Sequence, residues 1–346
     1  MPIINHKVLE NIAYGVFKAA GIPDEEAEII SDHIVTANLL GHDSHGVWYI
    51  SRYGQQALEK YVPWQNHDVI RENPLFKLFN GNGAHGIVAL TKATSIAMDK
   101  AHNSAIGMAG VKNVTHMGRL GAYPTHIAEQ GMIGMVWTNT GGLAVSPFGS
   151  AERKLRLAPV AFSVPRRNKP PFTLDMTFSV VAGGKIEQKI ARNETIPDGW
   201  LVNRNGNYEN EGSAYQNENA SILPLGGLQF GHKGQGLSMI MEMIVGPLTQ
   251  AGCTDYGNEK GGGALITAIN ISEFTDIETY LDEVEEFADY VRSAEKLPET
   301  KDIYAPGEME EAVKTHRNKT GIPVPDVTWE EIVEIATRLK VSIPSI

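Results

Sequence analysis

The 346-residue sequence predicts an α+β protein, because helical and strand patterns occupy separate stretches of the chain. Near the N-terminus, Val8, Ile12 and Val16 form one apolar stripe at helical spacing. From Leu75 onward, short stretches with a strand pattern alternate with helical ones. The length is sufficient for two domains. The change of pattern near 73–74 therefore marks the expected boundary between them.

The composition is that of a globular protein from a reducing compartment. Hydrophobic residues make up 42% of the chain, charged residues make up 21%, and the formal net charge is −11. This acidic balance argues against nucleic acid as a partner, because phosphate binding needs a basic face. Cys253 is the single cysteine, which excludes an intrachain disulfide. No N-terminal signal region and no membrane-spanning stretch is visible, so we expect a cytoplasmic protein without a membrane partner.

Periodicity and turn residues predict the remaining elements in order. Helices are expected over 7–40, 49–60 and 87–102, from Gly121 to Gln130, over 237–250 and 276–296, from Glu308, and over 328–340, where Thr328 and Glu331 would form a capping box. Strands are expected over 76–80, 106–111, 133–138, 160–164, 172–181 and 264–271, with a Pro-rich turn at 165–171 and a polar loop over 203–220.

A glycine-rich stretch, Gly81–Gly86, follows the first expected strand and matches the pattern GxGxxG. This pattern is the dinucleotide-binding fingerprint of the Rossmann fold when an acidic residue ends the next strand. Here that strand is followed by Lys112 and Asn113, without an acid. The pattern therefore favours a simple turn between a strand and a helix.

The densest group of reactive side chains is Gly41–Gly46, with the sequence GHDSHG. His45 is a natural general acid or base near neutral pH, and Ser44 or Asp43 is available to select its tautomer. His42 lies three residues before His45, but a zinc site needs three or four ligands and no further ligand pair is visible. A Ser-His-Asp hydrolase is also disfavoured, because the sequence contains no GxSxG elbow.

Further candidate binding residues lie elsewhere in the chain. Arg52 or Arg119 could hold a substrate carboxylate through a bidentate contact. His116 is either a buried hydrogen-bonded histidine or part of an anion site with Arg119. Asp175 lies in an apolar stretch, so its carboxylate must be paired or functional. Lys233 lies among glycines that precede the next expected helix, an arrangement that suits an anionic ligand.

Taken together, these residues resemble the type 2 malate/L-lactate dehydrogenase family of NAD(P)-dependent oxidoreductases. That family includes sulfolactate, ureidoglycolate, diketogulonate and cyclic imino-acid enzymes, and the resemblance extends over almost the whole chain. It is carried by GHDSHG at 41–46, His116-x-Gly118, Ala128–Gly131, Thr138-Asn139, Pro147–Gly149, Asp175-Met176, Ile196-Pro197-x-Gly199-Trp200, Leu223–Gly226, Gly231–Gly234 and Pro306–Glu308.

The resemblance implies a fold that is not Rossmann. In that fold a largely antiparallel sheet with helices binds the dinucleotide, beside an all-α domain built from both termini. We therefore expect a helical domain over 1–74 and 325–346 and an α+β cofactor-binding domain over 75–324. The resemblance also implies a homodimer whose active site lies near the subunit interface.

The implied reaction is hydride transfer between NAD or NADP, with NAD as first choice, and a small 2-hydroxy or 2-oxo acid. The proton donor of the family falls on His45, with Asp175 as a second catalytic residue that orients or assists it. The expected substrate-binding residues are Ser44, Tyr49, Arg52, His116 and Arg119. The expected cofactor contacts are Thr173, Leu174, Asp175, Met176, Thr177, His232, Lys233, Gly307, Glu308 and Met309. No metal is expected.

The chain departs from the family pattern at three places. Tyr49 stands where many members have an arginine four residues after the catalytic histidine, although Arg52 remains. Ala158 replaces the common asparagine before Pro159, and Gln229–Phe230 are extra residues before the GHKG segment. Two alternative functions therefore stay open: reduction of a cyclic imine to an amino acid, and ligand binding by a dimeric homologue that has lost activity.

Overall fold

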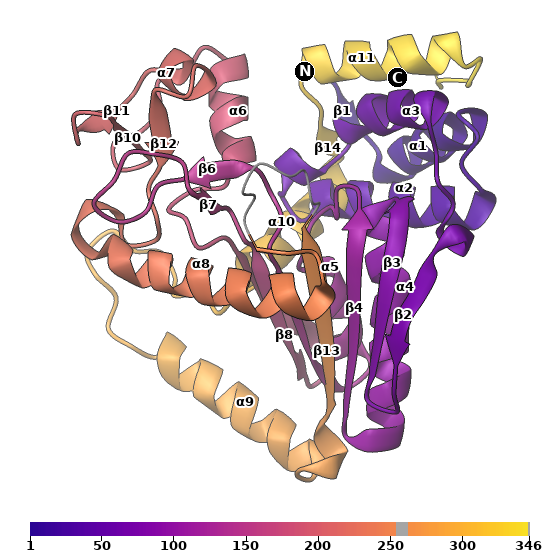
Figure 1. Cartoon of the computed structure of the whole chain (residues 1–346), viewed down its shortest axis with the longest axis vertical. Helices are drawn as coiled ribbons and strands as arrows, with labels where there is room; N and C mark the ends of the chain where they lie inside the picture. Colours follow the sequence, from indigo (N-terminus) through magenta and orange to yellow (C-terminus); the bar gives the residue numbers. More distant parts are fainter. Residues whose placement is uncertain (254–261, 345–346) are drawn as a thin grey trace.

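The computed structural model describes residues 1–253 and 262–344. These residues form eleven α-helices and three β-sheets, which confirms a mixed α/β protein. The largest sheet lies at the centre of the molecule, the terminal helices cover one end of it, and a smaller sheet lies beside that end (Figure 1).

The central sheet has seven strands in the order β2-β3-β4-β13-β5-β8-β9. All neighbours are antiparallel except β3 and β4, which are parallel because helix α4 connects them. This pairing agrees with the expected largely antiparallel sheet. The strands are β2 Asp68–Glu72, β3 Phe76–Ala84, β4 Ile106–Val114, β5 Met132–Thr138, β8 Val160–Arg166, β9 Lys169–Met176 and β13 Gly263–Asn270.

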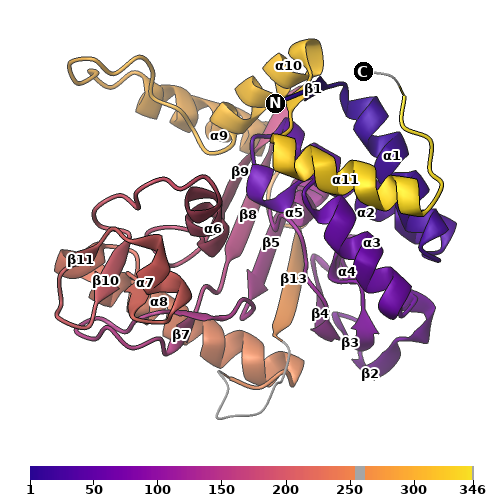
Figure 2. The same ribbon diagram turned by 90° about the horizontal axis from the view of Figure 1, so that it is seen from above.

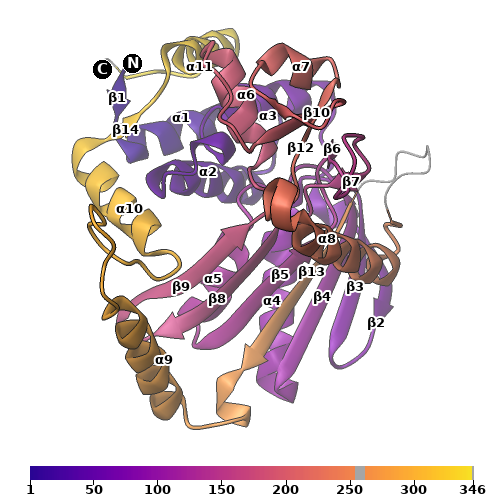
Figure 3. The same cartoon turned by 90° about the vertical axis from the view of Figure 1, so that its left-hand side faces the viewer.

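Helices cover the two faces of this sheet differently. Helices α4 (Gly86–Ser104) and α5 (Ala122–Glu129) pack on one face. Helices α8 (Gly227–Thr249) and α9 (Ile277–Arg292) lie on the opposite face (Figure 3). Strand β5 reflects this arrangement, because its residues alternate between buried and half-buried along the strand.

The two ends of the chain meet beside the central sheet (Figure 2). Strand β1 (Ile3–Ile4) pairs with β14 (Ile322–Pro323). The helices of this region are α1 His6–Ala19, α2 Asp24–Leu39, α3 Tyr49–Glu59 and α11 Asp326–Arg338. One hydrophobic core joins them to α4 and the sheet, with Phe17, Ile34, Ile87 and Val111 among its buried members. The division of the chain into two domains at 74 and 325 stays a prediction.

The smaller sheet has five strands in the order β11-β10-β12-β6-β7. Its strands are β6 Leu143–Val145, β7 Leu155–Arg156, β10 Leu201–Asn203, β11 Tyr208–Glu209 and β12 Ala220–Ile222, and helices α6 (Gly183–Ala191) and α7 (Gly212–Gln216) accompany them. The polar loop expected over 203–220 is therefore wrong. Within this stretch Tyr208–Glu209 pair with β10, Asn203 pairs with Ala220, and Gly212–Gln216 form a helix, which local polarity does not reveal.

Helix α8 begins earlier than expected. It starts at Gly227 and continues past a non-helical Phe230, so Lys233 lies inside the helix rather than before it. The expected helix start near 237 is wrong because the glycines serve close packing. A side chain on Gly234, for example, would clash with the backbone of Leu225.

Four smaller expectations also need correction. Strand β3 continues to Ala84 with a register shift after Asn80, so most of the turn expected at 81–86 is strand. Strands β8 and β9 occupy most of the expected Pro-rich turn, and β9 ends at Met176. Helix α11 begins two residues before Thr328, so the expected capping box is absent from its first turn.

Helix α10 (Glu308–Thr320) lies between the edge strand β9 and helix α2. At its start, the backbone N–H of Thr173 in β9 donates to Pro306 O at 3.1 Å. Along the part of the chain that the structure describes, no helix is long and apolar enough to cross a membrane.

Candidate active site

The GHDSHG motif forms a tight turn after helix α2. That helix ends at Leu39, and Asp43–His45 form a single 3-10 turn before α3 begins. Gly41 has a φ of +83°, a conformation that glycine adopts readily at the end of a helix. Gly46 packs so closely on the Asn38 side chain that a Cβ would clash with it. The expectation that the motif lies where a helix ends is confirmed.

His45 lies where this turn, the segment after β4 and helix α6 meet. Ser44 Oγ is 3.1 Å from Nδ1 of His45. A Cβ on Gly184 of α6 would lie 3.1 Å from Cβ of Ser44, so α6 packs directly on the turn. The ring of His116, which follows β4, stacks on His45 with centroids 5.7 Å apart. Ser44, rather than Asp43, is therefore the neighbour that orients His45.

Aromatic side chains of helix α3 extend this stack. The ring of Tyr49 lies 4.7 Å from that of His116 and 4.7 Å from that of Tyr53. Burial raises the pKa of Tyr49 to about 12, so its hydroxyl is neutral at physiological pH. The guanidinium of Arg52 lies 3.9 Å from the centroid of the Trp48 ring and is exposed. Arg52 therefore lies at the outer edge of the aromatic stack.

Tyr53 is a site residue that sequence reasoning missed. Its hydroxyl is 2.6 Å from Nδ1 of His116, and burial raises its pKa well above the ordinary value. The high pKa keeps this hydroxyl protonated, and a hydrogen bond from it to Nδ1 leaves the proton of neutral His116 on Nε2. Its spacing in the sequence could have identified it, because Tyr53 lies one helical turn after Tyr49 on the same face of α3.

His116 combines an ordered ring with an accessible surface. The surrounding protein lowers the pKa of His116, and the neighbouring His45 lowers it further. One side of the His116 ring is exposed to solvent, which weakens both effects. The imidazole is therefore neutral near pH 7. It presents an N–H group to whatever occupies the neighbouring space.

Arg119 and Asp175 come together around Gly121. Asp175 Oδ2 accepts a hydrogen bond of 2.6 Å from the backbone N–H of Gly121. A Cβ on Gly121 would lie 2.7 Å from Arg119 Nη1 and 2.9 Å from Asp175 Oδ2. Arg119 is only 6% exposed, and its backbone N–H donates to Nε2 of His33 at 2.8 Å. The expected partner for the Asp175 carboxylate is thus supplied by a backbone amide, with a buried cation nearby.

Burial and these two charges determine the protonation of the motif histidines. Burial lowers the pKa of His45, while Asp175 raises it and Arg119 lowers it. Burial also lowers the pKa of His42 to about 4, and Arg119 adds to that effect against Asp175 and Glu310. Both histidines are therefore neutral near pH 7, and His45 can accept a proton.

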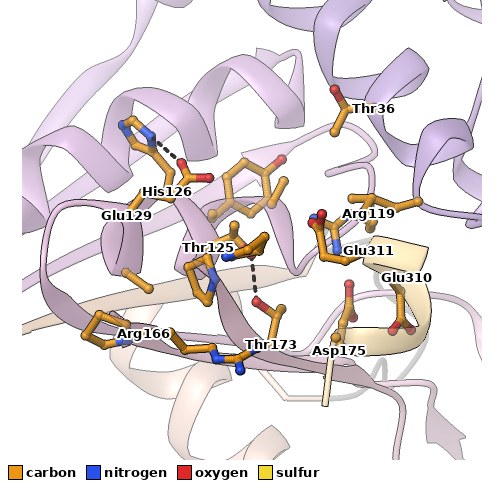
Figure 4. Close-up of a pocket in the computed structure, with 18 of the residues that line it drawn as sticks. Thr36, Arg119, Thr125, His126, Glu129, Arg166, Thr173, Asp175, Glu310 and Glu311 are labelled. Carbon is orange, nitrogen blue, oxygen red and sulfur yellow. Dashed lines mark hydrogen bonds and ion pairs between the residues drawn. The ribbon is translucent and has the colours of Figure 1, made fainter. Parts of the chain in front are cut away.

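A cavity of about 920 Å³ lies beside these residues (Figure 4). Its walls come from α2, α5, β9 and α10, and they include both Arg119 and Asp175. Figure 4 shows Asp175 and Glu310 close to Arg119, each on a different segment. Further along the wall, Thr125 and Thr173 share a hydrogen bond of 2.9 Å. The cavity therefore offers cations, carboxylates and hydroxyls along one surface.

The expected cofactor residues are only partly brought together. Thr173, Asp175 and Gly307 line the cavity. The carboxylate of Glu308 is engaged by Arg292 and, at 3.4 Å, by Arg166. Leu174, Met176, Thr177 and Met309 are neighbours in the chain that do not contribute to the cavity wall.

His232 and Lys233 lie apart from this cavity, on exposed turns of α8. The His232 ring packs against Phe148, with centroids 5.6 Å apart. Their contact with a cofactor stays a prediction, as do the roles of the other site residues.

Metal binding finds no supporting geometry in the described parts of the chain. Within them, no three or more His, Cys, Asp or Glu side chains are arranged to hold a metal ion. His42 instead lies 3.8 Å from Glu310, and His45 contacts the Ser44 hydroxyl and the ring of His116.

Known proteins resemble this chain over almost its whole length. The model of the malate/L-lactate dehydrogenase family matches residues 4–333. The malate dehydrogenase of Pyrococcus abyssi is 36% identical over 94% of this chain and 92% of its own length. The malate/(S)-sulfolactate dehydrogenase of Methanothermus fervidus is 32% identical over 99% of both chains. The crystal structure of malate dehydrogenase from Entamoeba histolytica superposes with a TM-score of 0.94, at 26% identity and 99% coverage of both chains.

These matches span almost the whole chain, and the first two exceed 30% identity. The chain therefore belongs to the malate/L-lactate dehydrogenase family and is a dehydrogenase.

Proposed function

We propose that the protein transfers a hydride between a nicotinamide dinucleotide and a small 2-hydroxy acid or its 2-oxo acid. The observation that carries this proposal is that Arg119 and Asp175 both line the 920 Å³ cavity and both act on the pKa of His45. A cavity of this size is in the range of cofactor sites, and proton transfer by His45, whose pKa responds to two residues of its wall, suits a dehydrogenase. The names of the malate and sulfolactate enzymes among the relatives support the same substrate class.

The residues around the cavity fit a dinucleotide. Gly307 has a φ of +90°, and a Cβ there would lie only 3.1 Å from the backbone N of Thr173, so this wall needs a glycine. Thr173, Asp175 and Gly307 would hold the cofactor, whose nicotinamide gives or takes the hydride when it is bound. NAD is proposed ahead of NADP, because Glu310 and Glu311 on the wall suit a ribose hydroxyl better than a phosphate. The binding surface would then be the largely antiparallel sheet rather than a Rossmann fold.

The protein's own groups move the proton and hold the substrate. In the oxidation direction, His45 accepts the hydroxyl proton, and in the reduction direction it returns that proton. Asp175 stabilises the imidazolium that forms, since it raises the pKa of His45. The Nε2–H of His116 donates a hydrogen bond to a substrate oxygen. Arg52 and Arg119 hold the carboxylate.

The proposed assembly is a homodimer in the cytoplasm. Helix α8 exposes large apolar side chains on the side away from the sheet, and α9 does the same. They include Leu237, Ile240, Met243 and Leu248 of α8 and Phe287 and Tyr290 of α9. An apolar surface of this kind is typical of a contact with another subunit. The cytoplasm is proposed because Cys253 is an exposed free thiol, which suits a reducing compartment.

A substrate panel tests the proposed reaction. The purified protein is mixed with NADH or NADPH and with pyruvate, oxaloacetate, 3-sulfopyruvate or a cyclic imino acid, and loss of reduced cofactor is followed by absorbance. We expect turnover with at least one 2-oxo acid and none with the cyclic imine. Turnover of the imine alone would replace the proposed substrate class. Dinucleotide binding without any turnover would instead favour an inactive homologue.

A further inference from the structure

Arg317, near the end of helix α10, contacts the GHDSHG turn from far along the chain. Its Nη1 lies 2.5 Å from Oδ1 of Asp43, and its Nη2 lies 3.1 Å from Oδ2. Nη1 also donates to the backbone carbonyl of Asn38. The Arg317 side chain is 14% exposed and the Asp43 side chain is 37% exposed, so this bidentate pair is partly shielded from water.

Asn38 completes the network from inside the turn. Its Nδ2 donates to Oδ1 of Asp43 at 2.6 Å, and its Oδ1 accepts from the backbone N–H of Val47 at 2.6 Å. Asn38 itself is buried. We call Asn38, Asp43 and Arg317 the turn clamp, because together they hold the residues on both sides of Ser44 and His45.

Helix α10 connects the turn clamp to the sheet that carries Asp175. At the start of the helix, Pro306 O accepts from Thr173 of strand β9. In the middle, Val313 packs against Gly41, where a Cβ would lie 3.3 Å from Cγ1 of Val313. Arg317 makes the last contact, with the turn itself. One helix thus spans the distance from the strand of Asp175 to the loop of His45.

We infer that Arg317 is a positioning residue for His45, acting through Asp43. The inference rests on the proposed function, because it assumes that His45 is the group that transfers the proton. Arg317 contacts Asp43 rather than His45, so its effect is on the geometry of the turn and not on the reacting atoms. The fork of a guanidinium can hold both carboxylate oxygens at once, whereas the ammonium of lysine cannot.

Kinetics of variants test this inference. Arg317→Met removes the pair, Arg317→Lys keeps the charge without the fork, and Asp43→Asn removes the partner charge. Arg338→Met is the matched control, since it removes a hydrogen bond of 2.5 Å to Gln55 between two helices of the same region. We expect Arg317→Met to lower kcat by about 100-fold, because small misplacements of a catalytic group have effects of this order. Arg317→Lys should fall between Arg317→Met and the parent protein.

Three further readouts separate positioning from general damage. The Kd for NADH should stay within about twofold of the parent value, since the proposed cofactor residues are not altered. The double variant Asp43→Asn with Arg317→Met should be no slower than Asp43→Asn alone, because both substitutions break the same Asp43–Arg317 ion pair. Arg338→Met should leave kcat unchanged. Parent-like kcat in Arg317→Met, an equal loss in Arg338→Met, or a parallel loss of NADH binding would overturn the inference.

A measurement without turnover keeps this inference separate from the proposed reaction. In protein labelled with ¹³C at the histidine Cε1, the His45 signal is assigned by comparison with His45→Ala. We expect Arg317→Met to shift or broaden that signal while the signal of exposed His102 stays in place. An unchanged His45 signal would contradict positioning by Arg317, even if the chain turned over a different substrate from those proposed.

Discussion

At the scale of single residues, the site depends on how histidines are kept neutral and oriented. His45 has Ser44 on Nδ1, His116 has Tyr53 on Nδ1, and His33 accepts the backbone N–H of Arg119. The backbone N–H of Arg119 fixes Nε2 of His33 as an acceptor, whereas the two hydroxyls hold Nδ1 of His45 and of His116 in a hydrogen bond. The proposed proton transfer therefore depends on the groups that contact the histidines as much as on the histidines themselves.

Replacing His45 tests the proposed proton transfer directly. We expect His45→Ala to lower turnover by about 100-fold to 10,000-fold, the usual contribution of a general acid or base. Binding of NADH, measured by fluorescence titration, should stay nearly intact, because His45 does not line the proposed cofactor cavity. His102→Ala on the exposed side of α4 is the control. Near-parental turnover in His45→Ala would rule out the assignment.

Replacing Tyr53 tests the tautomer of His116. Tyr53→Phe removes the hydroxyl 2.6 Å from Nδ1, so the proton of His116 is no longer confined to Nε2. We expect kcat/KM for the 2-oxo acid to fall by about tenfold, the value of one buried hydrogen bond. The ¹⁵N shifts of His116 should show a mixture of tautomers. Tyr61→Phe, which loses a hydroxyl contact with Glu26, is the control, and an equal loss there would exclude a specific role.

At the scale of elements, helix α8 has two different apolar faces. Ser238, Met241 and Val245 are buried on the side that faces the central sheet. Large apolar residues cover the other side too and remain exposed in a single chain. Glu242 is the one charged residue of α8 after Lys233, and a helix with so few polar positions is typical of a buried one, so the outer face of this part needs a partner.

A charge on the outer face of α8 tests the proposed homodimer. Ile240 is 55% exposed in the single chain, so Ile240→Glu costs little in a monomer but would bury a charge at a subunit contact. We expect sedimentation velocity to show a dimer for the parent protein and a monomer for Ile240→Glu. Val327→Glu, at a position on α11 that is 68% exposed, should remain dimeric. A monomeric parent protein would refute the proposed assembly.

At the scale of the whole molecule, buried histidines make stability depend on pH. Burial lowers the pKa of His85 to about 3 and lowers that of His33 well below its ordinary value. The unfolded chain titrates near the ordinary value of about 6.5, so it binds more protons than the native protein below that pH. The free energy of unfolding should therefore fall as the pH decreases from about 6.5 toward about 3.

Thermal unfolding as a function of pH measures this effect. Each such histidine contributes a slope of about 1.4 kcal/mol per pH unit within that range. His85→Asn should flatten the dependence, because asparagine can cap helix α4 as His85 does but does not titrate. His102→Gln, at an exposed position, should leave the slope unchanged. A parent-like slope in His85→Asn would show that the proton uptake occurs elsewhere.

Much of this protein follows from its sequence alone. The reactive groups of Gly41–Gly46 are adjacent in the chain, so their possible chemistry can be predicted without knowing the fold. The order of motifs carried the family resemblance, which the comparisons confirm. The helical pattern expected from residue 7 begins within one residue of α1, and the helix expected over 49–60 is α3, Tyr49–Glu59.

The tertiary structure decided which partners these groups have. Tyr53 meets His116 across 63 positions, and Arg317 meets Asp43 across 274, so no local pattern could join them. The strands of the smaller sheet likewise depend on pairing between distant segments, which overrode a polar, loop-like sequence. Periodicity and motif spacing predict only the local structure and the side chains that lie near one another in the sequence. Long-range contacts depend on how the whole chain packs, and these contacts orient the histidines.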